Sequence, residues 1–372
     1  MSKLNIRESM YETDELDIKV GRTQVIIPMQ ERMCPSGFVF KLLNGEIVVG
    51  GEMSGVDYPV DGRSVSMPPG QTSREYSWRR SADGGQTWHE TPSWPSYGVH
   101  QFPDGVTMCL SGRWCQIEPS SRYVYSVALF LSSDGGHTFK QEKAFLYDTP
   151  KLAQVKKIQR FDGERYANVN HQIVKIRDGS LLASVQGKFE GDIKERVFIM
   201  RSVVRSARRG KDWYYRSTVA FDLTRKGTRP LGFDEPNLLV LPDGEILCFM
   251  RTGSRCGGSL YMSRSGDFGK TWSHADPIAD RGVYPTACLM KNGVIAVVYG
   301  RPGDWLTFSL DRGETWVNHF CFNQTPEPND CGNYDWIEEV APDTLLVVYS
   351  RTDPNNCMIS EIMGTFFTVR PK

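Results

Sequence analysis

A short turn signal between apolar runs recurs along the whole chain, and it limits what the chain can fold into. An Asn-Gly or Asp-Gly pair, the commonest two-residue hairpin signal, separates short apolar runs at Asn44-Gly45, Asp104-Gly105, Asp178-Gly179, Asp243-Gly244 and Asn292-Gly293. A sixth copy keeps Asp343 but has Thr344 in place of the glycine. Regular recurrence of this kind is typical of β-propellers and solenoids, in which each repeat is one supersecondary unit.

A second motif, an eight-residue turn, follows most of these hairpins. Segments 81–88, 132–139, 265–272 and 309–316 fit S-x-D-x-G-x-T-[W/F], and 206–213 keeps the serine, glycine and tryptophan but has Arg208 at the aspartate position. In such a turn the Asp carboxylate caps amides, the glycine supplies a left-handed residue and the aromatic ring anchors the turn. Together the two motifs predict an all-β fold: a single domain over residues 1–372, built as a six-bladed β-propeller of four-stranded antiparallel blades.

Composition narrows the class of function. The 44 Lys and Arg balance 44 Asp and Glu, so no generic electrostatic attraction to nucleic acid or acidic membranes is expected. No apolar run is long enough for a transmembrane helix. The nine cysteines form no C-x-x-C pair, and the first residues lack an apolar stretch, which favours a cytoplasmic location. Nucleotide, zinc and serine-hydrolase motifs are absent from the sequence, so no metal or cofactor is expected.

The order of turns within a blade predicts which face carries the chemistry. If the innermost strand comes first, the hairpin turn and the eight-residue turn lie on one face. The opposite face is then built from the starts of the innermost strands and the loops between the second and third strands. A ligand on the axis would meet those segments. The turn aspartates are therefore predicted to be architectural: Asp83, Asp134, Asp267 and Asp311.

Arginines end the second strand of four repeats at equivalent positions: Arg113, Arg251, Arg301 and Arg351. If they converge, they create a positive pocket on the axis of a neutral protein. Guanidinium forks are the natural partners of a carboxylate, so this pocket would suit an acidic ligand. The alternative is a ring of arginines that each pair with a neighbouring acid.

The eight-residue turn resembles the Asp box of the sialidase (neuraminidase) superfamily, over about residues 36 to 351. The resemblance implies a fold more firmly than an activity, because the box also occurs in propellers that hydrolyse no sialic acid. It implies that Tyr334 is the nucleophile and Glu235 the base for its phenol. Arg251 and Arg301 match the second and third carboxylate-binding arginines of the family. The structural alternatives are a core aromatic for Tyr334 and a salt bridge to Arg251 for Glu235.

The acid/base aspartate of the family lies in the long loop of the first blade, residues 52–76 here. That loop offers Asp57 and Asp61. Asp57 is preferred, because Asp61 precedes a glycine and has the character of a turn residue. A carboxylic acid must be partly desolvated to hold its proton near neutral pH, and a loop folded over the pocket would provide this.

The first blade departs from the family pattern. Sialidases have an Arg-Ile-Pro type motif there, whereas CPSGFVFKLLNG has Ser36 and Lys41. Lys41 is close to the turn and poorly placed to substitute for the missing arginine. Either Arg113 or Arg351 completes the clamp from another blade, or the substrate is another acidic or neutral sugar. For that version the candidate acids are Asp57, Glu190 and Glu235.

The first hypothesis is an exo-acting glycoside hydrolase that cleaves a terminal sugar from a glycan. The resemblance implies that this sugar is acidic. Asp57, Glu235 and Tyr334 would be catalytic, and the arginines and His171 would bind the substrate. The second hypothesis is a propeller glycosidase that uses a carboxylate pair, or a polysaccharide lyase in which a histidine such as His100 or His171, or a tyrosine, abstracts the proton. The third is a catalytically silent propeller that binds a glycan or a protein.

Overall fold

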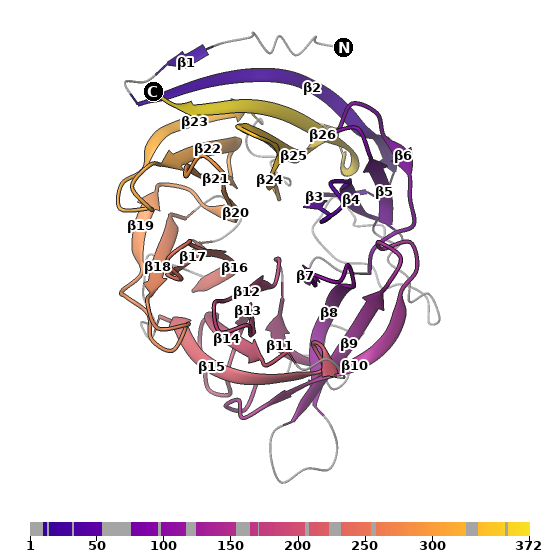
Figure 1. Ribbon diagram of the computed structural model, residues 1–372. Coiled ribbons are helices and arrows are strands. Elements are labelled where there is room, and N and C mark those ends of the chain that lie inside the picture. The colour runs from indigo at the N-terminus through magenta and orange to yellow at the C-terminus, as the bar shows by residue number, and fades with distance from the viewer. Residues whose placement is uncertain are drawn as a thin grey trace.

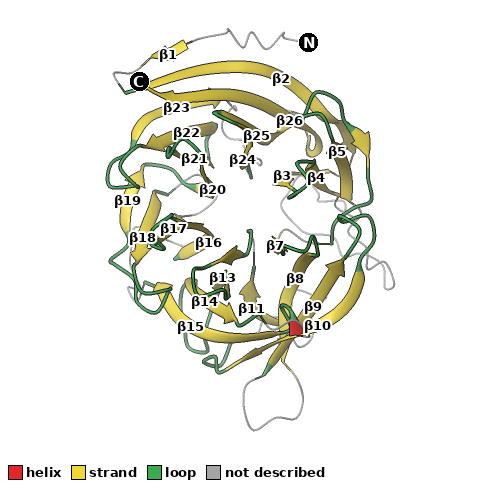
Figure 2. Cartoon of the chain, viewed as in Figure 1, coloured by secondary structure: helices red, strands yellow, loops and turns green. Residues whose placement is uncertain are grey.

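The computed structural model is all-β, as predicted, and almost entirely strand and turn (Figure 2). No helix in the part of the chain that it describes is long and apolar enough to cross a membrane. The described residues are 10–12, 15–31, 33–53, 76–95, 98–116, 124–153, 164–169, 171–204, 208–222, 232–253, 258–324, 334–353 and 356–372.

Three of the sheets are four-stranded antiparallel units of consecutive strands. The first comprises β3 (Met33–Lys41), β4 (Ile47–Met53), β5 (Tyr76–Ser81) and β6 (His89–Glu90). The second comprises β16 (Phe233–Val240), β17 (Ile246–Thr252), β18 (Leu260–Ser265) and β19 (Asp276–Ala279). The third comprises β20 (Val283–Leu289), β21 (Ile295–Gly300), β22 (Asp304–Ser309) and β23 (Val317–Asn323).

A nine-stranded sheet departs from the predicted separate blades. Its first strands are β7 (Gly98–Gln101), β8 (Thr107–Gln116), β9 (Tyr125–Ser132) and β10 (Lys140–Tyr147). The others are β11 (Glu164–Asn168), β12 (Val174–Lys175), β13 (Leu181–Gly187), β14 (Arg196–Ser202) and β15 (Asp212–Ala220). The two groups merge because the outer strands β10 and β15 pair in parallel, which satisfies two edges that would otherwise be open. β11 also pairs with β8.

The last sheet joins the two ends of the described chain. Its order is β1 (Met10–Glu12), β2 (Leu16–Glu31), β26 (Asn356–Pro371), β25 (Thr344–Asp353) and β24 (Trp336–Ala341). β2 runs antiparallel to β26 along most of its length, and the hydroxyls of Thr23 and Thr365 lie 2.8 Å apart across the pair. The sequence motifs gave no sign of this pairing, because residues 16–31 carry neither turn signal.

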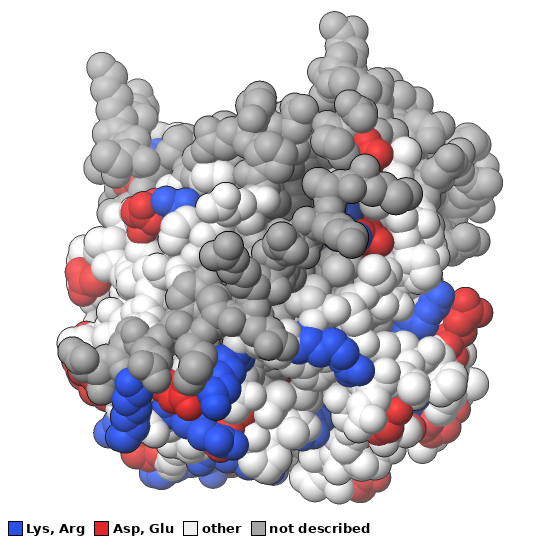
Figure 3. Space-filling view, turned by 90° about the horizontal axis from the view of Figure 1, so that it is seen from above, with Lys and Arg blue, Asp and Glu red and all other residues white. Residues whose placement is uncertain are grey.

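The sheets stand side by side around a common centre, with β3, β7, β16, β20 and β24 nearest to it (Figure 1). Apolar side chains fill the space between neighbouring sheets. Between the first and last sheets, the Phe38 ring lies 5.0 Å from Trp78 and 4.7 Å from Trp336, measured between ring centroids. All three rings are buried. Around the rim, the charged side chains visible in Figure 3 are mixed in sign.

Both turn motifs form as predicted. In the turn at 81–88, Asp83 Oδ1 accepts hydrogen bonds from the Gln86 and Thr87 amides at 2.9 Å, and Oδ2 accepts one from the Thr87 hydroxyl at 2.6 Å. These bonds hold the pKa of Asp83 well below its usual range, and the bond from the Thr87 hydroxyl contributes most. Asp134, Asp267 and Asp311 make equivalent bonds.

The sixth hairpin lacks the glycine and forms its turn with an aspartate in the left-handed conformation. Ala341 pairs directly with Thr344, which leaves a two-residue turn. Asp343 takes the left-handed conformation there, with φ of 58°. Aspartate tolerates this conformation better than most residues, so the repeat keeps its hairpin without a glycine.

Candidate active site

Glu235 lies at an irregular point of β16. The strand register with β17 shifts between Asp234 and Asn237, and Glu235 itself has a left-handed backbone with φ of 42°. Its amide donates a hydrogen bond to Asp234 Oδ1 at 2.7 Å. A bulge of this kind redirects a side chain, and left-handed non-glycine residues cluster at functional sites.

Two donors fix the Glu235 carboxylate, which is buried. Arg251 Nη1 donates to Oε1 at 2.7 Å, and the Tyr284 amide donates to Oε2 at 2.9 Å. Tyr284 also has a left-handed backbone, with φ of 48°, and belongs to β20 of the next sheet. Donors to both oxygens therefore hold the Glu235 carboxyl group in one orientation.

The Tyr334 phenol lies beside this carboxylate. The negative charge of Glu235 and then burial raise the pKa of Tyr334, while Arg251, which hydrogen-bonds the phenol, and Arg301 oppose the rise. The Arg301 guanidinium lies 5.5 Å from the centre of the Tyr334 ring, and the Tyr284 ring meets Tyr334 edge-on at 4.9 Å. Tyr334 is therefore protonated at neutral pH and has a carboxylate at hand to take its proton.

Ser36 occupies the place beside Tyr334. The two residues form a parallel β-bridge, and the Gly37 amide donates to the Tyr334 carbonyl at 3.0 Å. The missing arginine of the first blade therefore corresponds to a position inside the site. Lys41 lies at the other end of β3, where its amine donates to the Val340 carbonyl at 2.8 Å.

His171 is fully buried between aromatic rings. Its ring centre lies 4.3 Å from that of Tyr284 and 5.2 Å from that of Trp336. Nδ1 lies 2.9 Å from the Pro236 carbonyl, which only accepts, so Nδ1 carries the proton. Burial lowers the pKa of His171 to about 3, so the ring is neutral. The imidazole thus supports the residue directly after Glu235.

A second pair of acids lies behind Glu235. Asp234 and Glu195 are both buried, and their carboxyl groups interact directly with each other. Burial, followed by the charges of Glu235 and Glu195, raises the pKa of Asp234 well above its usual value. The sequence analysis missed Glu195, because it precedes β14 without belonging to any motif.

Other candidate residues lie elsewhere. Arg351 pairs with Glu361 across β25 and β26, as Arg251 pairs with Glu235. Both arginines therefore fit the alternative hypothesis, in which each arginine pairs with an acid of the protein. Glu190 is exposed and pairs with Lys151 at 2.6 Å. His100 lines a pocket near the hairpin turns with Lys41, apart from His171.

Some predicted residues fall outside the described part of the chain. These are Asp57, Asp61 and the side chain of Arg113, whose backbone in β8 pairs with Asn168. Within the described residues, no group of three or more His, Cys, Asp and Glu is arranged to hold a metal ion. The structure thus brings together Glu235, Arg251, Arg301, Tyr334 and His171, and their roles in catalysis and binding stay predictions.

Comparisons with known proteins place this geometry in a family. Residues 108–341 match the BNR repeat-like domain, which is more than half of the 372 residues. Comparison with curated proteins gives no match. The resemblance to the sialidase superfamily is confirmed at the level of fold by this domain and by the solved structures that the chain resembles.

Three of those structures illustrate the range. A Dyadobacter fermentans protein of unknown function is 19% identical, with a TM-score of 0.71 over 95% of this chain and 99% of that one. An α-L-arabinofuranosidase of Fusarium graminearum, solved with arabinobiose, is 13% identical, with a TM-score of 0.62 over 93% and 97%. The K499G mutant of the NanB sialidase of Streptococcus pneumoniae is 12% identical, with a TM-score of 0.60 over 93% of this chain and 70% of that one. At these identities the likeness concerns the fold.

Proposed function

This chain belongs to the BNR repeat-like domain family, and from that premise we propose that it is an exo-acting glycoside hydrolase with a six-bladed propeller fold. The nine-stranded sheet counts as two blades whose outer strands have joined. The observation that carries the proposal is the oriented Glu235 carboxylate beside a protonated Tyr334. The likeness to sugar-cleaving enzymes supports a glycan substrate.

The proposed mechanism uses Tyr334 as nucleophile. Its oxygen bonds to the anomeric carbon while its proton passes to Glu235, and the bond from the anomeric carbon to the leaving oxygen breaks. A general acid protonates that oxygen, and Asp57 is the proposed donor. Water then attacks the glycosyl-tyrosine with Asp57 as base, and Glu235 returns its proton to the phenolate.

One observation bears on the terminal sugar. Arg251 is already paired with Glu235, Arg351 with Glu361, and Ser36 stands where sialidases have their first arginine. A sugar carboxylate would have to share these guanidinium groups with buried protein acids, which weakens any clamp. A neutral terminal sugar is therefore favoured over sialic acid, with the acidic sugar predicted from the sequence as the second candidate.

The test is a panel of aryl glycosides that includes the α-L-arabinofuranoside and the α-sialoside. Turnover should be lost in Tyr334→Phe and Glu235→Gln, by about 10³-fold or more for the nucleophile, because the chemical step loses its covalent route. Matched controls are Tyr214→Phe and Glu314→Gln, which change exposed residues far along the outer strands and turns. The controls should match the wild-type protein.

Each outcome has a distinct meaning. Turnover of a neutral glycoside, lost in both variants, supports the proposal and the neutral sugar. Turnover of the sialoside instead supports the hydrolase but overturns the neutral sugar. A Tyr334→Phe variant that stays active moves the mechanism to a carboxylate pair. Silence of the wild-type protein on the whole panel overturns hydrolysis and favours a lyase or a binding protein.

A further inference from the structure

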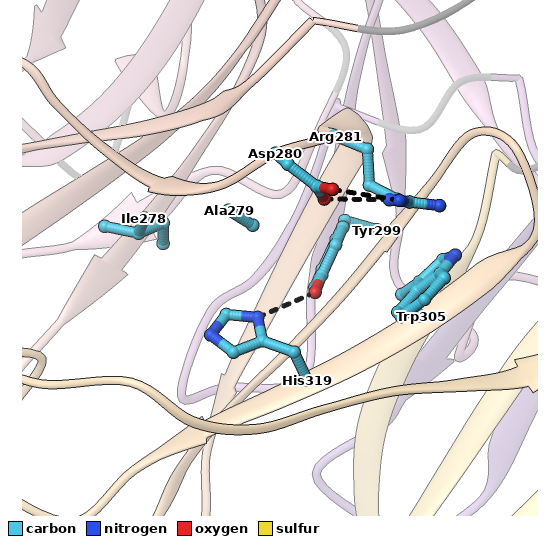
Figure 4. A pocket seen from close by; sticks show the side chains of 7 residues that line it. All are labelled: Ile278, Ala279, Asp280, Arg281, Tyr299, Trp305 and His319. Carbon is cyan, nitrogen blue, oxygen red and sulfur yellow. Dashed lines mark hydrogen bonds and ion pairs between the residues drawn. The ribbon is translucent and has the colours of Figure 1, made fainter.

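A pocket with a cavity of about 310 Å³ lies between the outer strands of the two sheets that supply Glu235 and Tyr284 (Figure 4). It is lined chiefly by Asp280 and Arg281 after β19, Tyr299 of β21, Trp305 of β22 and His319 of β23. The link after β19 leads directly to Tyr284, and the loop after β21 holds Arg301. Both segments belong to the face that carries Glu235 and Tyr334.

Short connections tie the pocket to that site. Arg281 precedes Tyr284 by three residues, which an extended chain spans in about 10 Å. Arg281 Nη1 and Trp305 Nε1 both donate to the Pro302 carbonyl, at 3.3 and 2.8 Å. Pro302 is bonded to Arg301, so the pocket adjoins the loop that carries Arg301.

The pocket carries balanced charge and directed polar groups. Arg281 binds both Asp280 oxygens at 2.9 Å and stacks on the Trp305 ring at 4.1 Å. The Tyr299 hydroxyl lies 2.9 Å from His319 Nδ1, and burial lowers the pKa of His319, so that ring is neutral near pH 7. Paired charges, a neutral imidazole and an aromatic wall suit an uncharged ligand with many hydroxyl groups.

We propose that this pocket binds a neutral sugar residue of the glycan chain whose terminal sugar lies at Glu235. The volume is at the lower end of that of small-molecule sites, which suits one sugar residue better than a long chain. The Asp280 and Arg281 pair offers acceptors and donors to ring hydroxyls. The inference deepens the proposed hydrolase function and rests on it, because it assigns the pocket to the same substrate.

The experiment compares two substrates that share a terminal sugar. One is the aryl glycoside turned over by the wild-type protein, which is too short to reach the pocket, and the other is the matching oligosaccharide, such as arabinotriose. Asp280→Ala and Trp305→Phe should lower kcat/KM for the oligosaccharide by about 3- to 10-fold, as expected for the loss of one polar or aromatic contact. The aryl glycoside should be cleaved at the wild-type rate. His274→Ala, a change of an exposed residue just after the turn at 265–272, is the control.

The remaining outcomes separate the two proposals. Equal losses on both substrates, or no loss on either, would overturn the pocket assignment while the hydrolase stands. If the wild-type protein cleaves nothing, the hydrolase fails, and the pocket is tested by titrating arabinotriose and cello- and xylo-oligosaccharides while following tryptophan fluorescence. Binding that weakens in Asp280→Ala then supports a neutral-sugar site, and no binding of any of these probes overturns it.

Discussion

Carboxylates on the two faces of the molecule are held in opposite ways. On the turn face, Asp83 takes its hydrogen bonds from residues within four positions of itself, and its surroundings are open to water. On the axial face, Glu235 is buried and takes its bonds from residues 16 and 49 positions away in the chain. Both carboxylates are fully satisfied, but only the axial one depends on the assembly of neighbouring sheets.

The comparison separates architecture from chemistry. An aspartate whose hydrogen-bond donors lie within its own turn can close that turn wherever it occurs, so the same motif recurs along the chain. The Glu235 carboxylate is instead satisfied through tertiary contacts, and the protein accepts left-handed backbone at Glu235 and Tyr284 to hold it. The predictions below test this contrast from the strongest expected effect to the weakest.

Removal of Arg251 should have the largest effect. Arg251→Met leaves Glu235 buried without its ion pair, so the free energy of unfolding should fall by about 3 to 5 kcal/mol. Denaturant unfolding measures this, and turnover of the aryl glycoside should fall by about 10² or more, because Tyr334 loses its hydrogen bond as well. Arg251→Lys keeps the positive charge, so its stability and turnover should lie between those of the wild-type protein and Arg251→Met. If Arg251→Met were as stable as the wild-type protein, the Glu235 carboxylate would not depend on its tertiary partner, and the contrast with Asp83 would be wrong.

Asp234 should make the protein less stable as pH rises. Its pKa in the folded protein is raised by burial, Glu235 and Glu195 and lowered by Arg251, so the folded state binds the proton more tightly than the unfolded chain. The stability it contributes is complete below about pH 4 and declines by about 1.4 kcal/mol per pH unit until the folded pKa is reached. Asp234→Asn mimics the protonated acid and should lack this decline.

The measurement is the difference in unfolding free energy between the wild-type protein and Asp234→Asn from pH 4 to 8. A difference that grows with pH agrees with a raised pKa of Asp234 in the folded protein. A constant difference means that the pKa of Asp234 is not raised by folding. The pH profile of turnover is a second readout, since a purely structural pair would leave it unchanged.

His171 should have a smaller effect and none on the pH profile near neutrality. Its neutral ring donates to Pro236, which also accepts a hydrogen bond from the Ser184 hydroxyl, so His171→Gln should cost about 1 to 2 kcal/mol. The imidazole signals in nuclear magnetic resonance should not titrate between pH 5 and 8, because its pKa is about 3. Titration within that range would place His171 in contact with solvent or with an acid.

Asp83 should show the smallest effect, and only on stability. Asp83→Asn replaces one acceptor oxygen by a donor facing the Thr87 hydroxyl and amide, so the melting temperature should fall modestly. Because the folded pKa is lowered, this stabilisation is present above about pH 4 and is lost as the pH falls below it. Turnover at neutral pH should not change. Thr87→Val is the matched variant, and lost turnover in either would mean that the turn face reaches the site.

Local motifs made the repeating part of the fold predictable. The hairpin and Asp-box turns depend on residues within eight positions, so their types and spacing predicted the turns and the strands that flank them. The merged nine-stranded sheet was not predictable, because its parallel pairing involves Phe145 and Asp212, which are far apart in the sequence and carry no pairing signal.

Some of the residues that the structure brings together were predicted from the sequence, but the pairing of their charges was not. The resemblance to the sialidase superfamily pointed to Glu235 and Tyr334, yet the sequence could not show that Glu361 would pair with Arg351 across two neighbouring strands. Nor could it show Glu195 beside Asp234, since buried acid pairs form only where distant loops meet. The hydrogen bond from the Tyr284 amide to Glu235 could not be predicted either, because almost every residue has a backbone amide.

The pairing of β2 with β26 has a consequence for synthesis of the protein. The partners Thr23 and Thr365 are 342 positions apart, so the last sheet closes only when nearly all of the chain has been made. Until then β25 presents an unprotected edge, and β2 is paired only along its other edge, with β1. Loop closure of this span is slow, and exposed edges invite association between nascent chains. Cells that make this protein quickly should therefore depend on chaperones that shield strands late in translation.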